Sequence, residues 1–269
     1  MRRIWFKSDT IKRDPEFEEY MQSEGFDVIY GKAPLEYDPG TLVVTDDPDV
    51  FKEEENALVY IRDEKDTDLF PGARYFVMDA EDCYADYFVK IWQRFNDLPW
   101  VIGETERLIL RETVEEDLKD FIEIYADPRM TEFTEGLFED EAELEYITEY
   151  RKKVYEVQGF GIWTVVRKSD KKVIGRAGLV YRAGSEGVET GFAIGTKYWG
   201  EGYGSEAVRE CVHQAKRLGF DRVTALVMPG NVRSERLLRS LDFSKTSETV
   251  HDGRDYEIWE LMLPLTETV

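Results

Sequence analysis

The chain has 269 residues, of which 42% are hydrophobic, so it is long enough for two domains with apolar cores, and its composition excludes wholesale disorder. A net charge of −22 argues against nucleic acid as a partner, because phosphate binding requires a basic face. No run approaches the roughly 18 apolar residues of a membrane helix, so no association with a membrane is expected. The two cysteines fit no metal or disulfide pattern, so we expect a cytoplasmic protein that binds no metal.

Residues 1–100 alternate short apolar runs with acidic segments of helical pattern. Strands are predicted over residues 2–6, 26–31, 41–47, 57–63 and 73–82, and helices over residues 15–25, 46–55 and 83–95. The pair Asp47-Pro48 is typical of a helix start, with an acidic cap before a proline in the first turn. Strands that alternate with helices predict a small α/β domain with a mostly parallel sheet.

The pattern breaks near residue 100, in the segment NDLPWVIGETERL. Pro99 and Gly103 interrupt two patterned segments there, as is typical of a boundary. We therefore predict one domain over residues 1–100 and a second over residues 101–269. The first domain has no glycine-rich phosphate loop. We expect it to be a scaffold, a module that recognises an acceptor, or a dimerisation module that makes the protein a homodimer.

Residues 101–269 show a different order of elements. Strands are predicted over residues 106–112, 160–168, 171–182, 188–195, 221–228 and 256–263, and helices over residues 113–127, 139–159, 205–220 and 230–243. A capping box of Thr113 and Glu116 is expected to open the first helix. The turn at Ser169-Asp170 joins two strands of an antiparallel meander. This order predicts an α/β (α+β) domain with a mixed, mostly antiparallel sheet flanked by helices.

The glycine-rich segment YWGEGYGS, residues 198–205, lies between a predicted strand and a predicted helix. Backbone N–H groups in a first helical turn have no helical partner, and the helix dipole adds positive charge, so a phosphate fits there. Glycines at positions 200, 202 and 204 let an anion approach those amides. A tight turn without a ligand is the alternative. The segment lacks the Gly-Lys-Ser/Thr of a P-loop and the acidic residue that dinucleotide-binding folds carry after the next strand.

Residues 104–265 resemble, element by element, the GNAT superfamily of N-acetyltransferases, and within it the group that acetylates the N-terminal amines of ribosomal proteins. The segments ETGFAIGTKYWGEGYGSEAV and NVRS carry the resemblance. The superfamily's pyrophosphate loop, Arg/Gln-x-x-Gly-x-Gly/Ala, aligns with residues 199–204, where Trp199 replaces the arginine or glutamine. The resemblance implies acetyl-CoA as acetyl donor, with its pantetheine arm in a gap between the strands at 191–194 and 221–228. The cofactor-binding residues that it implies are Phe192, Ala193, Ile194, Trp199, Gly200, Glu201, Gly202, Tyr203, Gly204, Ser205 and Asn231.

Acetylation of an amine requires that the amine loses a proton, that the thioester oxygen is stabilised as it gains charge, and that the leaving thiolate is stabilised. By the same resemblance, a main-chain N–H near Phe192 or Ala193 stabilises the oxygen, Ser234 assists the thiolate, and Glu189 acts as base. A helix-surface position for Ser234, a helix N-cap for Asn231 and binding of a cationic acceptor by Glu189 are the alternative interpretations.

The predicted function is transfer of an acetyl group from acetyl-CoA to a primary amine, either the N-terminal amine of a protein or a small cationic amine. Direct transfer is favoured over an acetyl-enzyme, because Cys211 has the pattern of a core residue. An acyl-CoA-binding regulatory or interaction protein without turnover is the alternative. The acceptor pocket is expected to come from the helix pair at residues 113–127 and 139–159 and from the segment at residues 126–136. The side chains that suit a cation with an apolar flank are Glu132, Glu135, Trp163 and Tyr181.

Overall fold

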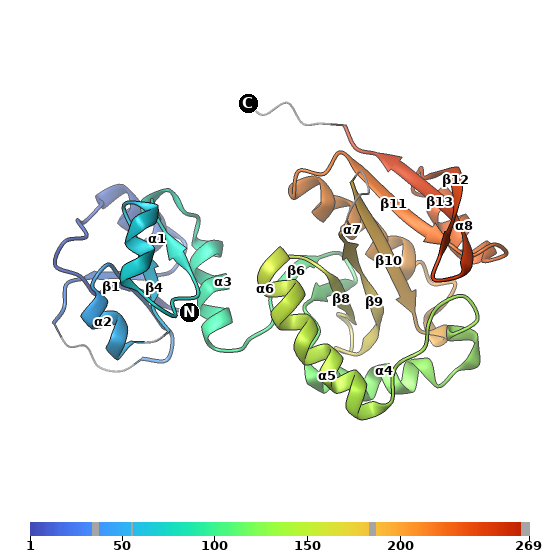
Figure 1. Ribbon diagram of the computed structural model, residues 1–269, viewed down its shortest axis with the longest axis horizontal. Helices are drawn as coiled ribbons and strands as arrows, with labels where there is room; N and C mark the ends of the chain where they lie inside the picture. Colours follow the sequence, from blue (N-terminus) through green and yellow to red (C-terminus); the bar gives the residue numbers. More distant parts are fainter. Residues whose placement is uncertain (34–37, 55, 183–186, 265–269) are drawn as a thin grey trace. The chain divides into compact units, whose positions relative to one another are not determined.

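Two separate β-sheets organise the chain, each with its own apolar core (Figure 1). The computed structural model describes residues 1–33, 38–54, 56–182 and 187–264, and the chain divides into two compact units, Met1–Trp100 and Val101–Val269. Among the described residues, no helix is both long and apolar enough to cross a bilayer.

The first unit is built on a five-stranded parallel sheet in the order β2-β1-β3-β4-β5. Its strands are β1 (Arg3–Phe6), β2 (Asp27–Tyr30), β3 (Thr41–Thr45), β4 (Leu58–Tyr60) and β5 (Phe76–Val77), and its α-helices are α1 (Pro15–Ser23), α2 (Pro48–Glu53) and α3 (Ala85–Phe95). Short 3-10 helices cover Glu64–Leu69 and Ala80–Asp82. The predicted parallel α/β sheet is confirmed.

Helix α3 illustrates how the first unit forms its core. Its most deeply buried apolar residues recur at helical spacing, so they share one face of the helix. They belong to the same apolar cluster as Ile4 of β1 and Leu42 of β3. The residues on that face are Ala85, Phe88, Ile91 and Phe95.

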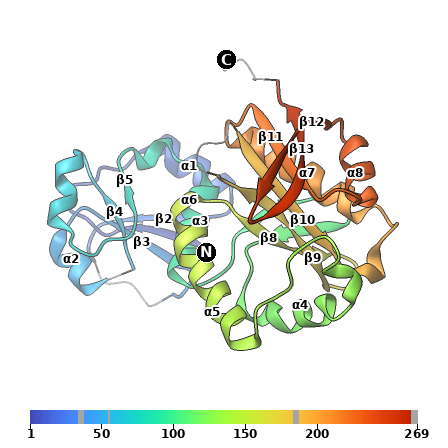
Figure 2. The ribbon, with the colours of Figure 1, turned by 45° about the vertical axis from the view of Figure 1, so that its right-hand side comes forward.

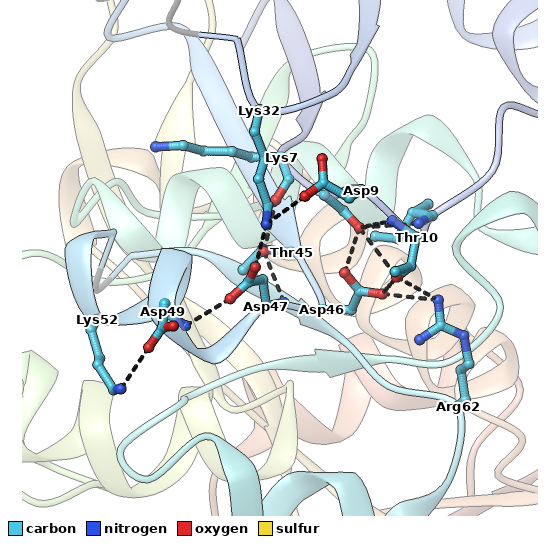
Figure 3. Close-up of polar contacts among 12 residues, drawn as sticks. Lys7, Asp9, Thr10, Lys32, Thr45, Asp46, Asp47, Asp49, Lys52 and Arg62 are labelled. Atoms are coloured by element: carbon cyan, nitrogen blue, oxygen red, sulfur yellow. Dashed lines mark hydrogen bonds and ion pairs between the residues drawn. The ribbon is translucent and has the colours of Figure 1, made fainter.

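A cluster of charged and hydroxyl side chains follows the carboxyl ends of β1 and β3 (Figure 3). Asp46 accepts hydrogen bonds from Thr10 and, at 2.9 Å, from Arg62. Asp47 caps α2 with its carboxylate and forms an ion pair with Lys32, which lowers the pKa of Asp47. The predicted capping role of Asp47 is therefore confirmed, and its charge is matched within the cluster.

The second unit contains an eight-stranded sheet in the order β12-β13-β11-β10-β9-β8-β7-β6 (Figure 2). Its strands are β6 (Val101–Glu104), β7 (Leu108–Arg111), β8 (Ile162–Arg167), β9 (Val173–Val180), β10 (Val188–Ile194), β11 (Arg222–Val227), β12 (Ser244–His251) and β13 (Arg254–Met262). All neighbouring pairs are antiparallel except β10 and β11, which are parallel. The predicted mixed, mostly antiparallel sheet is confirmed.

Helices cover both faces of this sheet. They are α4 (Leu118–Tyr125), α5 (Asp140–Tyr150), which continues through a π-helical turn (Arg151–Tyr155) into α6 (Glu156–Gln158), then α7 (Tyr203–Arg217) and α8 (Val232–Arg239), with 3-10 turns at Glu115–Asp117, Pro128–Met130 and Thr196–Tyr198. Leu108 of β7 packs in one cluster with Ala207 of α7, whereas its neighbour Ile109 packs in another with Phe121 of α4. Because successive strand residues point to opposite faces, α7 and α4 cover opposite sides.

Two strands of the second unit are absent from the sequence-based prediction, namely β6 and β12. They form the two edges of the sheet. The residues of β12 read SKTSETVH and are nearly all exposed, and those of β6 are exposed or half-buried. Edge strands of this kind lack the apolar alternation on which strand prediction depends.

The predicted capping box of Thr113 and Glu116 is wrong. The hydroxyl of Thr113 lies 3.0 Å from the hydroxyl of Thr164, inside the protein rather than at a helix terminus. Asp117 accepts the N–H of Val114 instead, at 3.1 Å. The helical segment therefore begins one residue later than the sequence pattern indicates, with Val114 as N-cap of the 3-10 turn that precedes α4.

Candidate active site

The two parallel strands at the centre of the second sheet separate along their length. Strand β10 pairs with β11 only at Val188–Val223 and Glu189–Thr224. Beyond these pairs β10 continues to Ile194, held by β9 on its other side, while β11 remains paired with β13. The predicted gap between these two strands is confirmed, and it leaves one edge of β10 open.

The glycine-rich loop leads from the end of β10 into α7. Gly200 and Gly202 both have φ of +83°, a left-handed conformation that favours glycine. Gly202 is the N-cap of α7 and supplies no capping side chain. Within the part of the chain that the structure describes, no acceptor is found for the N–H groups of Tyr203, Gly204 and Ser205. These donors and the positive end of the helix dipole make the N-terminus of α7 suitable for an anion.

Gly204 also lies close to α8. A Cβ atom there would lie 2.8 Å from Cδ1 of Leu237 in α8, so a larger residue would require the Leu237 side chain to shift.

A first cavity, of about 600 Å³, lies where the loop, the open edge of β10 and α8 meet. It brings together Ser234 and all of the predicted cofactor residues except Glu201, whose carbonyl oxygen accepts a hydrogen bond from Arg107 at 3.0 Å. Glu189 does not line this cavity. The predicted residues that line the cavity are Phe192, Ala193, Ile194, Trp199, Gly200, Gly202, Tyr203, Gly204, Ser205, Asn231 and Ser234.

Three arginines that the sequence analysis did not select also line the first cavity: Arg129, Arg233 and Arg236. The guanidinium of Arg233 lies 3.6 Å from the centre of the Trp199 ring, and that of Arg129 lies 5.7 Å from it. Trp199 is itself fixed by a hydrogen bond from Nε1 to the carbonyl oxygen of Ile194, at 2.6 Å. Trp199 thus holds positive charge beside the glycine-rich loop, at the position where the family pattern has arginine or glutamine.

Asn231 and Ser234 lie at the start of α8. The side chain of Asn231 accepts the N–H of Ser234 at 3.2 Å, so the interpretation of Asn231 as a helix N-cap is confirmed. The hydroxyl of Ser234 is not used in this cap. Both residues border the first cavity.

Glu189 is held in an ion pair. Its carboxylate accepts hydrogen bonds from Arg182 at 2.6 and 3.1 Å, and its side chain is only 13% exposed. Another nitrogen of Arg182 lies 2.9 Å from Nε2 of His251. Glu189 occupies the same face of β10 as Gly191 and Ala193, because alternate strand residues share a face.

A second cavity, of about 700 Å³, adjoins the first and shares Thr134, Phe192 and Ala193 with it. Tyr125 of α4 and Tyr146 and Tyr150 of α5 form part of its wall, and Glu135, from the segment at residues 126–136, also lines it. Trp163 does not, because its ring is completely buried in the core, and neither does Tyr181, which is exposed elsewhere. Residues of the predicted helix pair that line this cavity include Tyr125, Glu143, Tyr146 and Tyr150. Lining residues outside the segments that the sequence indicated for the acceptor pocket include Phe138, Arg176 and Arg182.

No other chemistry competes with these two cavities in the described ranges. The described residues contain no group of three or more His, Cys, Asp or Glu side chains arranged to hold a metal. Cys211 is completely buried in the apolar core, and burial raises the pKa of its thiol to about 12. A thiol of this kind stays protonated and is a poor nucleophile.

Comparison with known proteins assigns the second unit to a family. A family model described as an acetyltransferase (GNAT) domain matches residues 107–244. The uncharacterized N-acetyltransferase p20 of Bacillus licheniformis is 30% identical over 162 residues, covering 57% of this chain and 85% of p20.

Solved structures share the fold. A GNAT-family acetyltransferase from Bacillus anthracis superposes with a TM-score of 0.51 at 20% identity, covering 59% of this chain and 96% of its own. RimL, a ribosomal L7/L12 alpha-N-protein acetyltransferase solved in complex with coenzyme A, gives 0.53 at 12% identity, covering 62% of this chain and all of its own. The matched family domain spans slightly more than half of the chain, and the chain therefore belongs to the GNAT family of acetyltransferases, which are acyltransferases.

Proposed function

We propose that the second unit transfers an acetyl group from acetyl-CoA directly to a primary amine. The observation that carries this proposal is the first cavity, where an uncapped helix N-terminus, three arginines and an unpaired strand edge face one space. Arg129 forms an ion pair with Asp127, which leaves Arg233 and Arg236 as the candidate partners of an anion. The helix N-terminus and the arginines suit a pyrophosphate. The open edge of β10 suits the amide groups of a pantetheine arm, which can bind there as an added strand does.

The two cavities suit the two substrates of this reaction. An acetyl donor in the first cavity and an amine in the second would meet beside Phe192 and Ala193, which line both. A main-chain N–H of these residues is our candidate donor to the thioester oxygen as it gains charge. Ser234 is our candidate donor to the leaving thiolate, and Glu189 is our candidate base, acting through water. Because Cys211 is buried in the core, we favour direct transfer over a mechanism with an acetyl-enzyme intermediate.

We also propose that residues 1–100 and 101–269 are separate domains. The matched family model lies entirely within the second, which supports assigning acetyl transfer to that unit alone. For the first domain we propose a role in scaffolding, acceptor recognition or dimerisation. The cytoplasmic location of the protein remains a prediction.

The test of the proposed function combines two measurements on the full chain. Isothermal titration with acetyl-CoA measures donor binding, and release of free thiol from acetyl-CoA across a panel of amines measures turnover. Saturable binding and amine-dependent thiol release are expected. Binding without release for every amine supports the alternative, an acyl-CoA-binding regulatory protein. Absence of binding contradicts the assignment of the first cavity.

Replacing Ser234 with alanine is expected to lower kcat by about 10–100-fold, because a hydrogen bond to a charged group contributes about 1.5–3 kcal/mol. The helix cap should survive, since Asn231 binds the main chain of Ser234. Steady-state kinetics of thiol release measure the effect. Ser247→Ala, at an exposed position of β12, is the control and should match the unsubstituted protein. An unchanged kcat in Ser234→Ala would remove Ser234 from the mechanism.

Replacing Glu189 with glutamine is expected to lower kcat by about 100-fold, the smaller end of the range for loss of a general base. Glutamine keeps the shape of the side chain and one acceptor for Arg182, so the thermal midpoint should change little. The pH dependence of kcat separates the two roles. If the fall of kcat at low pH disappears in the variant, this supports Glu189 as the base. A profile of normal shape and height means that Glu189 serves only as the partner of Arg182.

A further inference from the structure

One part of the wall of the second cavity is a row of three aromatic rings, Phe138, Tyr146 and Tyr150. The ring centre of Tyr146 lies 5.7 Å from that of Phe138 and 5.5 Å from that of Tyr150. Phe138 is 62% exposed and Tyr146 is 43% exposed, so both rings are accessible to a ligand. The Tyr150 hydroxyl accepts the N–H of Ile162 at 2.9 Å, which fixes the deepest ring of the row. The row offers flat apolar surface to a molecule in the cavity.

The cations of this cavity are already neutralised. Arg176 donates to Glu143 at 2.8 Å, and Arg182 forms the ion pair with Glu189. The second oxygen of Glu143 accepts the N–H of Phe138 at 3.1 Å, so this carboxylate has little capacity left for a ligand. Neither arginine therefore presents an unpaired charge that would attract an anionic acceptor.

One carboxylate of the lining remains for a cationic acceptor. Glu135 is exposed and has no ion pair within the residues that the structure describes. Glu132 and Glu135 also line a neighbouring hollow with Arg254, whose single positive charge offsets only one of the two carboxylates. The charge balance of the cavity thus matches a single ammonium group, whereas a polyamine or an aminoglycoside carries several.

The shared residues of the two cavities orient such an acceptor. An amine must reach Phe192 and Ala193 to meet the acetyl donor, while the aromatic row lies farther along the second cavity, on α5 and the segment before it. A molecule with its amine at one end and a ring at the other would satisfy both requirements. Its ring would stack against the row, and its amine would lie at the junction.

We propose that the acceptor is a monoamine whose amino group is attached by a short link to an aromatic or large apolar group. The proposal rests on the proposed acetyl transfer and specifies its substrate. Two sources carry this chemistry, a free arylalkylamine and the N-terminus of a peptide that begins with an apolar residue. Polyamines, aminoglycosides and free amino acids lack it, the first two because of their charge and the last because of their carboxylate.

Thiol release with five probes tests the proposal: 2-phenylethylamine, phenylalaninamide, phenylalanine, spermidine and kanamycin. The expected kcat/KM for 2-phenylethylamine or phenylalaninamide is at least tenfold above that for each of the other three. Preference between these two separates the free amine from the peptide-like source. Preference for spermidine or kanamycin, preference for phenylalanine, or no turnover of either aromatic amine overturns the proposal.

The acetyl-CoA titration keeps failure of this proposal distinct from failure of the proposed function. Saturable acetyl-CoA binding with the wrong acceptor preference overturns only the acceptor class. Loss of acetyl-CoA binding overturns the function on which the acceptor class rests.

Tyr146→Ala provides a second test. Removal of the central ring is expected to raise KM for the preferred aromatic amine about tenfold, with kcat and the acetyl-CoA affinity nearly unchanged, and Tyr146→Phe should restore KM. Tyr181→Ala is the matched control, because it removes an exposed tyrosine outside both cavities. Equal KM values for Tyr146→Ala and Tyr181→Ala overturn the assignment of the aromatic row to the acceptor.

Discussion

Replacing Ser205 with aspartate is expected to weaken acetyl-CoA binding by at least about 100-fold while leaving the fold intact. Ser205 lies in the first turn of α7 and lines the first cavity. A carboxylate there would occupy the free N–H groups and repel a pyrophosphate, and two unit charges about 4 Å apart near a protein surface interact by about 4 kcal/mol. Negative charge in the first turn of a helix is itself stabilising, so the thermal midpoint should stay equal or rise.

The control for this substitution is Ser205→Asn, which has the size of aspartate without its charge. It is expected to weaken acetyl-CoA binding by less than about tenfold. Isothermal titration gives both dissociation constants, and thermal denaturation reports the fold. Equal affinities for the aspartate and asparagine variants would mean that no anion binds at the N-terminus of α7. A lower thermal midpoint for the aspartate variant alone would mean that the residue has a structural role.

Replacing Gly178 with alanine is expected to lower the free energy of unfolding of the second unit by about 3 kcal/mol, the upper part of the range for overpacking. A Cβ atom at Gly178 would lie 2.1 Å from the carbonyl oxygen of Gly161 and 2.6 Å from Cα of Ile162. Both are backbone atoms, so β8 and β9 would have to move apart. Denaturant unfolding measures the change, and the thermal midpoint should fall by roughly 6–12 °C for a unit of this size.

Gly191→Ala is the matched control for stability, because it adds the same methyl group in the neighbouring strand β10. Its Cβ atom would lie 3.3 Å from the terminal methyl group of Ile162, which can rotate away. The expected loss is under about 1 kcal/mol. If both variants lose the same free energy of unfolding, close approach of the backbones at Gly178 does not account for the loss.

Much of the fold was predictable from local patterns. The parallel sheet of the first unit follows from apolar runs separated by helical segments, and the antiparallel meander β8–β10 follows from three successive apolar runs, the first two joined by the turn at Ser169-Asp170. The edge strands β6 and β12 were not predictable, since an edge strand is defined by the neighbour that it pairs with and not by its own apolar pattern. The same limit explains Thr113, whose hydroxyl binds a residue distant in sequence, Thr164.

Residue order along the chain is enough to predict the glycine-rich loop. Gly200 and Gly202 adopt the left-handed conformation that glycine favours, and the helix N-terminus without a capping side chain follows directly from residue order. The groups that surround the loop depend instead on tertiary packing. Arg233 reaches Trp199 from another helix, and Glu189 is already bound by Arg182. Backbone conformation depends on neighbours along the chain, whereas pairing of side chains depends on which distant elements pack together, and no local pattern encodes that.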